Sequence, residues 1–134
     1  MLKHNLRPLN NIELSGLALK MNIKDFRGVF MRDSLPNQIN EKEVGIVNLD
    51  STNNVGTHWV CYKKVGNKCY YFDSFGIDPP IEIIKYLKGE NTLIECSTFQ
   101  IQKFNTHHCG YYCLLLLKLL EKYKFQETIM SLIL

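Results

Sequence analysis

The chain of 134 residues lacks any long hydrophobic run. Its longest apolar stretch, Tyr111–Leu117, ends at Lys118 and is far shorter than the roughly 20 residues that a membrane-spanning helix requires. The N-terminal stretch Met1–Arg7 contains basic residues but is followed by no apolar run, so it does not resemble a signal peptide. We therefore expect a soluble, intracellular protein with no membrane partner.

Paired cysteines and a strong charge of one sign are also missing. The five cysteines are odd in number and have no spacing typical of a small disulfide-bonded domain, which favours buried thiols in a reducing compartment. The net charge is only +3, from 16 basic and 13 acidic residues, so the lysine clusters at 63–68 and 118–124 favour solvated faces over a nucleic-acid surface. No repeat or linker interrupts the sequence, and we expect a single domain over residues 1–134 with one core.

The residue pattern predicts a mixture of helices and strands. Asn10 and Glu13 form a capping-box pattern that predicts a helix start, and the apolar first turns of the stretch from Cys109 predict a central, buried helix. Helices are expected at 11–21, from Pro79-Pro80 to about Lys88, and from Cys109 to about Tyr123. Strands are expected at Phe26–Met31, Val44–Leu49, His58–Val65, Lys68–Asp73, Leu93–Cys96 and Phe99–Lys103.

A hairpin signal brings two polar residues together. Gly66-Asn67 stands between two strand-like runs and predicts a two-residue turn. In that register His58 lies opposite Phe75, and His58 and Asp73 become diagonal neighbours on one face, about 7–8 Å apart at the backbone. An imidazole–carboxylate hydrogen bond is then within reach. A slip of one residue would put the two side chains on opposite faces.

Cys109 stands where a loop becomes a helix. The free amides and the positive dipole end at a helix start favour the thiolate of a cysteine. Gly110 lacks a side chain and is expected to leave room for a substrate beside the sulfur. Trp59 follows His58 and faces away from it by strand alternation, so it is expected either to pack in the core or to shape a substrate channel.

Four residues together supply the parts of a thiol acyl-transfer site: His58 as a base, Asp73 to orient it, Cys109 as a nucleophile and Gln102 as an amide donor for the oxyanion. Gln100 shares the expected strand face of Gln102 and is the competing donor.

A metal site is a weaker interpretation of the same region. His107, His108, Cys109 and Cys113 are close in sequence, but a second ligand pair at a zinc spacing is missing. We therefore expect no metal and no cofactor. His107 and His108 are expected to be exposed loop residues, and Cys113 a core residue.

The order of these motifs resembles the adenovirus endopeptidase (adenain) family, which shares a clan with the SUMO-specific proteases. The motifs are Gly56-Thr57-His58-Trp59, Tyr71-Phe72-Asp73-Ser74-Phe75-Gly76, Gln102 and, after six residues, Cys109-Gly110. Similar stretches occur at Phe26–Phe30, Leu35-Pro36 and Ile46–Asn48, so the resemblance covers about residues 10–122.

The resemblance implies an α+β, papain-like protease core in which a central helix carries the nucleophile and packs against a mixed or antiparallel sheet. It implies the catalytic roles given above for His58, Asp73, Gln102 and Cys109. It also implies a thiol endopeptidase that acts on viral or virus-like precursor proteins at glycine-containing sites, in a host nucleus or a virion. We expect the protein to be a monomer.

The chain departs from the adenain pattern in three ways. The acid is Asp73, where adenain has a glutamate. Asn91 stands at the position of the adenain cysteine that bonds an activating peptide, so peptide activation is not indicated, and the small net charge does not indicate activation by DNA. The chain ends about 25 residues after Cys109, which leaves no counterpart for the last helical region of adenain and implies a minimal core.

Other functions use similar parts. An isopeptidase that removes ubiquitin-like modifiers shares the chemistry, and a thiol acyltransferase uses the same order of histidine, acid and cysteine. A non-catalytic binding module is disfavoured because all four positions are filled.

Overall fold

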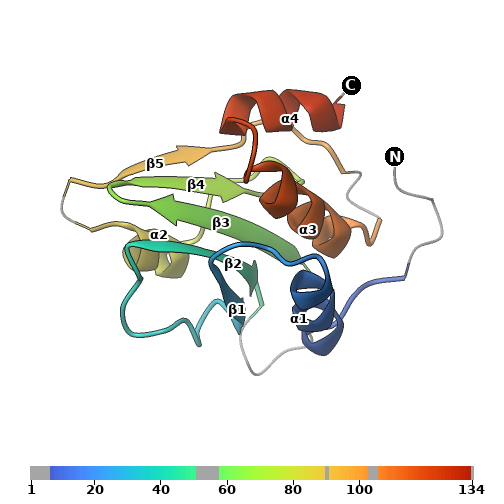
Figure 1. Cartoon of the computed structure of the whole chain (residues 1–134), viewed down its shortest axis with the longest axis horizontal. Helices are drawn as coiled ribbons and strands as arrows, with labels where there is room; N and C mark the ends of the chain where they lie inside the picture. Colours follow the sequence, from blue (N-terminus) through green and yellow to red (C-terminus); the bar gives the residue numbers. More distant parts are fainter. Residues whose placement is uncertain (1–6, 51–57, 90, 103–105, 134) are drawn as a thin grey trace.

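The computed structural model describes residues 7–50, 58–89, 91–102 and 106–133. Within them the chain forms helices and strands in the order α1, β1–β4, α2, β5, α3, α4 (Figure 1). The helices are α1 (Asn11–Lys20), α2 (Ile81–Leu87), α3 (Cys109–Leu119) and α4 (Phe125–Ile133), and the strands are β1 (Phe26–Met31), β2 (Lys42–Asn48), β3 (Trp59–Val65), β4 (Lys68–Phe72) and β5 (Leu93–Cys96). None of the helices in these ranges is long and apolar enough to cross a membrane.

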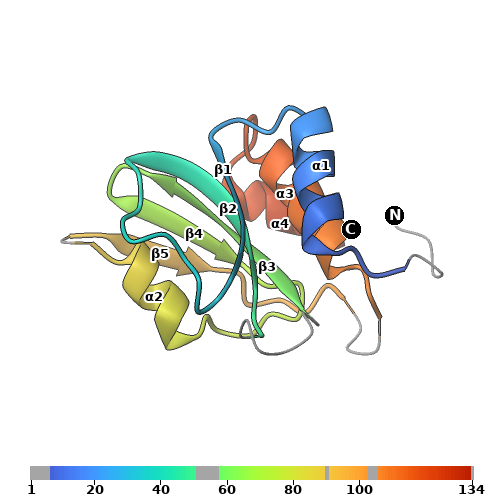
Figure 2. The same cartoon turned by 90° about the horizontal axis from the view of Figure 1, so that it is seen from below.

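The five strands form one mixed sheet in the order β1-β2-β3-β4-β5. The central pairs β2–β3 and β3–β4 are antiparallel, whereas the outer pairs β1–β2 and β4–β5 are parallel. Helices α1, α3 and α4 cover one face of the sheet, and α2 lies on the other (Figure 2). The expected α+β class is confirmed, including a central helix that starts at Cys109 and packs on a mixed sheet.

Strand alternation divides the buried side chains between the two faces. On β3, Trp59 and Cys61 belong to the core under α3, whereas Val60 and Tyr62 belong to the core on the side of α2. Strand β2 is buried on both faces, since every residue of the strand after Lys42 is buried. The sheet is therefore the middle layer of three.

The predicted turn at Gly66-Asn67 fixes the register of β3 and β4. Val65 pairs with Lys68, and the ladder continues without a shift to Cys61 and Phe72. Gly66 has a φ of 61°, a left-handed conformation that glycine adopts without strain. Because this register is the predicted one, the start of β3 and the end of β4 lie side by side.

The N-terminal helix begins as its capping box predicted. The amide of Glu13 donates to Asn10 Oδ1 at 2.8 Å, and the amide of Asn10 donates to Glu13 Oε1 at 3.1 Å. These two bonds satisfy donors that a helix start otherwise leaves free.

Two predictions about the C-terminal half were wrong. Phe99–Gln102 form no strand, since the amides of Ile101 and Gln102 both turn back to the carbonyl of Ser74, at 2.8 and 2.9 Å. Lys103, the last residue of that expected strand, lies outside the described residues. The helix from Cys109 ends at Leu119, where Lys63 Nζ donates to the Leu120 carbonyl at 2.9 Å, and a separate helix, α4, follows.

A buried carboxylate holds the face of the sheet that α2 covers. Glu43 is 1% exposed, and it accepts hydrogen bonds from Tyr62 and Tyr86 at 2.5 and 2.6 Å and from Arg27 and the amide of Asn40, both at 2.8 Å. Burial raises the pKa of Glu43, but these bonds more than offset it, and the pKa lies below its usual value. The carboxylate is fully paired, as a buried charge must be for stability.

Gly45 gives a test of this packing. A Cβ at Gly45 would lie 2.5 Å from the Tyr62 hydroxyl and 2.7 Å from its ring, and this side chain cannot move without disturbing its bond to Glu43. We expect Gly45→Ala to lower the free energy of unfolding by roughly 1–3 kcal/mol, measured by urea denaturation. The control is Gly16→Ala on α1, where nothing lies within 4 Å, and it should stabilise the protein by up to about 1 kcal/mol. Equal effects of the two substitutions would contradict the packing described.

Candidate active site

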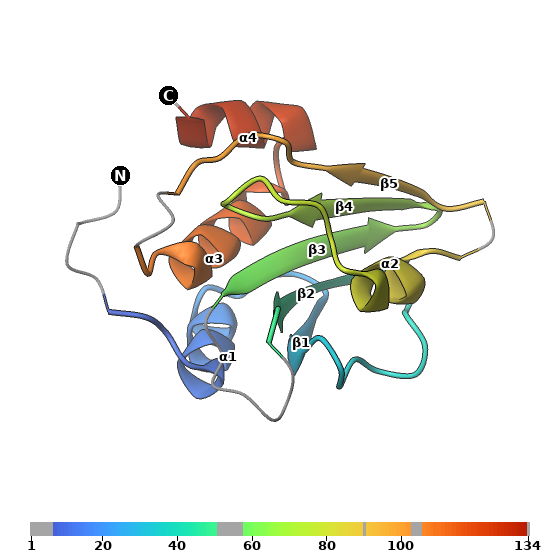
Figure 3. The same cartoon turned by 180° about the vertical axis from the view of Figure 1, so that it is seen from behind.

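Three chain segments meet at one end of the sheet. The start of β3, the end of β4 and the first turn of α3 lie together (Figure 3). His58 precedes β3, Asp73 follows β4, and Cys109 is the first residue of α3. The register of β3 and β4 brings the first two together, and the packing of α3 on β3 brings the third.

His58 and Asp73 form a buried pair. His58 Nε2 lies 2.6 Å from Asp73 Oδ1, and the exposed fractions of the two side chains are 11% and 0%. The same Oδ1 accepts the amide of Phe75 at 2.8 Å. Asp73 Oδ2 is buried and has no hydrogen-bond partner among the described residues. The Asp73 carboxylate is thus held against the imidazole through Oδ1, while within the described residues no hydrogen bond offsets the burial of Oδ2.

The imidazole has one nitrogen toward the acid and one left for the thiol. Because Asp73 takes Nε2, Nδ1 is the nitrogen available to Cys109, and within the described parts of the chain Nδ1 has no hydrogen-bond partner at ordinary distance. Burial lowers the pKa of His58, but Asp73 and then Cys109 more than offset it and raise the pKa to about 9. The ring is therefore an imidazolium near neutral pH, the state that stabilises a thiolate beside it.

Phe75 covers the imidazole. The rings of His58 and Phe75 are 4.0 Å apart between centroids and only 7° from parallel. The predicted register placed Phe75 opposite His58, but sequence reasoning gave it no role. Its ring limits the rotation of the imidazole, and its amide holds Asp73, so one residue orients both members of the pair.

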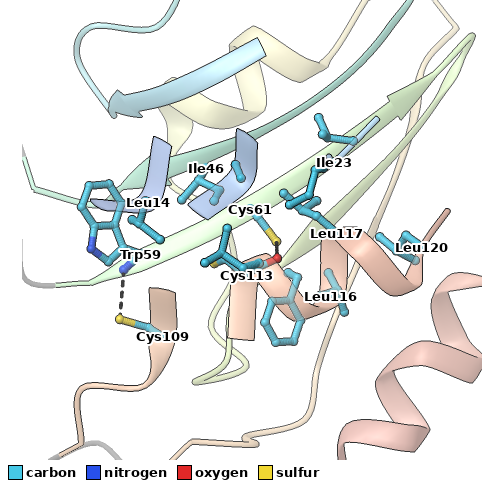
Figure 4. Packing of buried hydrophobic residues seen from close by; sticks show 14 of the residues in the cluster. Leu14, Ile23, Ile46, Trp59, Cys61, Cys109, Cys113, Leu116, Leu117 and Leu120 are labelled. Atoms are coloured by element: carbon cyan, nitrogen blue, oxygen red, sulfur yellow. Dashed lines mark hydrogen bonds between the residues drawn. The ribbon is translucent and has the colours of Figure 1, made fainter. Parts of the chain in front are cut away.

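Cys109 lies at the edge of the core with its sulfur toward β3. The amide of Trp59 donates to Cys109 Sγ at 3.4 Å, as Figure 4 shows. The preceding residue, His108, makes no capping hydrogen bond with its side chain, so it does not satisfy the free amides of the first turn. The helix start thus offers a positive dipole end to the sulfur, and the His108 side chain occupies none of its first-turn amides.

Gln102 is joined to the turn that carries Asp73. Ser74 Oγ donates to Gln102 Oε1 at 2.5 Å, and Gln102 Nε2 donates to the Thr106 carbonyl at 2.9 Å. Gln102 is buried, whereas the competing Gln100 is exposed and donates to the Gln102 carbonyl at 3.0 Å. Sequence reasoning missed Ser74, which belongs to the Asp73–Gly76 motif but has no catalytic chemistry of its own.

Trp59 and Gly110 lie in the packing around the thiol. The indole of Trp59 is buried and donates to the Leu9 carbonyl at 2.9 Å. A Cβ at Gly110 would meet Leu14 at 3.2 Å and Leu9 at 3.5 Å. The space beside Gly110 is therefore filled by the segment around α1, and the expected contact of either residue with a substrate stays a prediction.

The histidines before Cys109 differ from each other. His107 is exposed as expected, but His108 is 8% exposed and packs near Tyr112, so its assignment as an exposed loop residue was wrong. It directly precedes the first turn of α3, where Cys109 and Gly110 are buried as well. Cys113 is a core residue, as expected. In the described ranges no group of three or more histidine, cysteine or acidic residues could hold a metal ion. Gly56 and Thr57 of the histidine motif lie outside those ranges.

No protein-family model and no curated protein sequence matches the chain. Solved structures do match. The ASFV pS273R protease superposes with TM-scores of 0.64 and 0.65 at 17% identity, covering 96% and 94% of this chain and 64% and 62% of the protease. The SUMO protease Ulp1, with its catalytic cysteine oxidized to a sulfinic acid, superposes with a TM-score of 0.56 at 14% identity, covering 96% of this chain and 75% of Ulp1.

The chain thus has the fold shared by these two proteases and spans less than two thirds of the ASFV protease. The fold expected from the resemblance to adenain and the SUMO-specific proteases is confirmed.

The raised pKa of His58 gives a pH dependence of stability. The pKa is about 9 in the folded state and about 6.5 in an unfolded chain. The pair therefore stabilises the fold fully below about pH 6.5, and this contribution, up to about 3 kcal/mol, is lost as the pH rises through 9. Urea denaturation between pH 6 and 10 should show the loss, and His58→Gln should remove it. An NMR titration midpoint for His58 at or below 6.5 would contradict the assignment.

Phe75 supplies a matched variant for the same titration. A cation above an aromatic face is stabilised by about 0.5–2 kcal/mol, so Phe75→Leu, which keeps an apolar cover, should lower the pKa of His58 by roughly 0.4–1.5 units. Phe75→Trp keeps the aromatic face and should leave the midpoint near 9. An unchanged midpoint in the leucine variant would show that the stacking has no electrostatic effect.

Proposed function

We propose that the chain is a cysteine protease in which residues 1–134 form one minimal catalytic domain. The observation that carries the proposal is the buried His58–Asp73 pair beside a cysteine at the start of a buried helix. A buried carboxylate oxygen without a hydrogen bond lowers the stability of a fold. Destabilising groups of this kind are found most often at functional sites. The likeness to two proteases of the same fold supports the assignment.

Each residue has a role in this proposal. The thiolate of Cys109 attacks the carbonyl carbon of the scissile amide, and the carbonyl oxygen becomes an oxyanion that accepts hydrogen bonds from Gln102 and from the Cys109 amide. His58 donates its proton to the leaving nitrogen as the C–N bond breaks, which leaves an acyl group on the sulfur. His58 then takes a proton from water, and the resulting hydroxide attacks the thioester carbonyl. The C–S bond breaks, which releases the peptide acid and restores the Cys109 thiolate and the His58 imidazolium. Asp73 orients the imidazole throughout.

The proposed substrates are proteins cut after glycine or another small residue. Cys109 is 4% exposed and the neighbouring Trp59 is 5% exposed, so we expect a narrow approach to the sulfur. A branched side chain next to the scissile bond would then hold the carbonyl away from Gln102. The resemblance to adenain suggests a processing endopeptidase for viral or virus-like precursors, and the likeness to the ASFV protease supports it. A host nucleus or a virion as the place of action rests on the resemblance alone.

An isopeptidase for ubiquitin-like modifiers is the second candidate. The likeness to the SUMO protease Ulp1 supports it, and the aspartate at position 73, where adenain has a glutamate, suits the SUMO-protease branch equally. The chemistry at Cys109 would be the same, so only the substrate distinguishes the two functions.

The reactivity of Cys109 can be compared with that of Cys96 in one experiment. Burial raises the pKa of Cys96, whereas Cys109 lies beside the imidazolium of His58. We expect iodoacetamide at pH 7 to alkylate Cys109 at least about tenfold faster than Cys96 although Cys96 is more exposed, as measured by peptide mass spectrometry over time. His58→Ala should slow the reaction at Cys109 alone. Faster alkylation of Cys96 would contradict the proposal.

Substrate profiling tests the function itself. We expect the protein to cleave peptides with glycine before the scissile bond, and Cys109→Ala and His58→Ala to abolish turnover. Thiol reagents should inhibit and metal chelators should not. Conjugates of ubiquitin-like modifiers are assayed beside the peptides, and faster cleavage of one substrate class decides between the endopeptidase and the isopeptidase. A preference for arginine, lysine or a large aromatic residue before the cut would refute the proposed specificity, and turnover by Cys109→Ala would refute the nucleophile.

A further inference from the structure

Ser74 lies between the two halves of the proposed site. It is completely buried, and it follows Asp73, which holds His58. Its hydroxyl donates to Gln102 Oε1 at 2.5 Å, and its carbonyl accepts the amides of Ile101 and Gln102 at 2.8 and 2.9 Å. Three hydrogen bonds therefore join one residue of the acid turn to the segment that carries the glutamine.

These contacts decide which way the Gln102 amide faces. Its oxygen lies against a hydroxyl, which can donate, and its nitrogen lies against the Thr106 carbonyl, which can only accept. A rotation of the amide by 180° would place two carbonyl oxygens together at Thr106. The nitrogen of Gln102 thus stays toward Thr106, three residues before Cys109. One N–H donates to the Thr106 carbonyl, and the second N–H has no acceptor among the described residues.

We propose that Ser74 is a positioning residue that sets the orientation of the Gln102 amide for the oxyanion. The inference rests on the proposed function and adds a residue to it. The turn Asp73-Ser74-Phe75 then orients both the His58 imidazole, which transfers the proton, and the Gln102 amide, which donates to the oxyanion. Asp73 and Phe75 hold the imidazole, and Ser74 holds the amide donor.

A double-mutant cycle tests whether Ser74 acts through Gln102. In the wild-type background, Ser74→Ala should lower kcat about tenfold and leave KM within about twofold. The reason is that a misplaced Gln102 amide weakens a hydrogen bond to the oxyanion, which forms only as the transition state is reached. In the Gln102→Ala background, which itself should lower kcat by about 10²–10³, Ser74→Ala should change kcat by less than about twofold. An equal fall in both backgrounds, or no fall in the wild type, would overturn the proposal.

The pH profile separates this role from a structural effect on Asp73. The midpoint that reports His58 should stay where it is in Ser74→Ala, since the imidazole keeps its own partners. A shifted midpoint together with the loss of kcat would show that the substitution acts on Asp73, and the proposal would fall. If Ser74→Ala does not fold, Ser74→Cys keeps the size and weakens the donor, and wild-type kcat in that variant would overturn the proposal as well.

A wild-type protein without turnover on any substrate would refute the proposed function but leave this inference testable. The readout is then the hydrogen exchange of the Gln102 side-chain amide by NMR. It should become at least about tenfold faster in Ser74→Ala than in wild type or in the control Ser97→Ala, which loses a hydroxyl near Asp73. Equal exchange in Ser74→Ala and wild type would overturn the positioning role.

Discussion

The register of the β3–β4 hairpin is the constraint on which the candidate site depends. The ladder from Val65–Lys68 to Cys61–Phe72 delivers His58 and Asp73 to the same end and the same side of the sheet. A shift of one residue would reverse every side chain on β4, which would expose the apolar face under α3 and separate the imidazole from its carboxylate. Stability and the proposed function therefore favour the same register.

Two buried carboxylates on this sheet have opposite character. Glu43 is paired on both oxygens by two tyrosines, an arginine and a backbone amide, which is the arrangement that a stable core requires. Asp73 is equally buried, but Oδ2 has no partner within the described residues, and its main contact is an imidazole whose pKa it raises. Glu43 thus joins α2 to the sheet through Tyr86, whereas Asp73 raises the pKa of His58.

The helix α3 connects the core to the proposed active site. Its side chains fill the space between the sheet and α1, and Gly110 allows Leu9 and Leu14 to approach closely. This packing fixes the first residue of the helix, so the position of the Cys109 sulfur is set by the hydrophobic core and not by a flexible loop. A rigid scaffold of this kind is what positioning of a nucleophile requires.

The sequence by itself determined most of the secondary structure and the pairing of His58 with Asp73, because strand period, capping and turn chemistry are local and the hairpin converts them into one long-range contact. It predicted a strand at Phe99–Lys103 that does not form in the described part, since the carbonyl of Ser74 competes for the amides of Ile101 and Gln102. The roles of Phe75 and Ser74 also depended on the tertiary structure. The hairpin register placed Phe75 opposite His58, but the stacking of the two rings depends on their packing. The Ser74 hydroxyl is 28 residues away in sequence from its acceptor, and no periodicity in the chain encodes that contact.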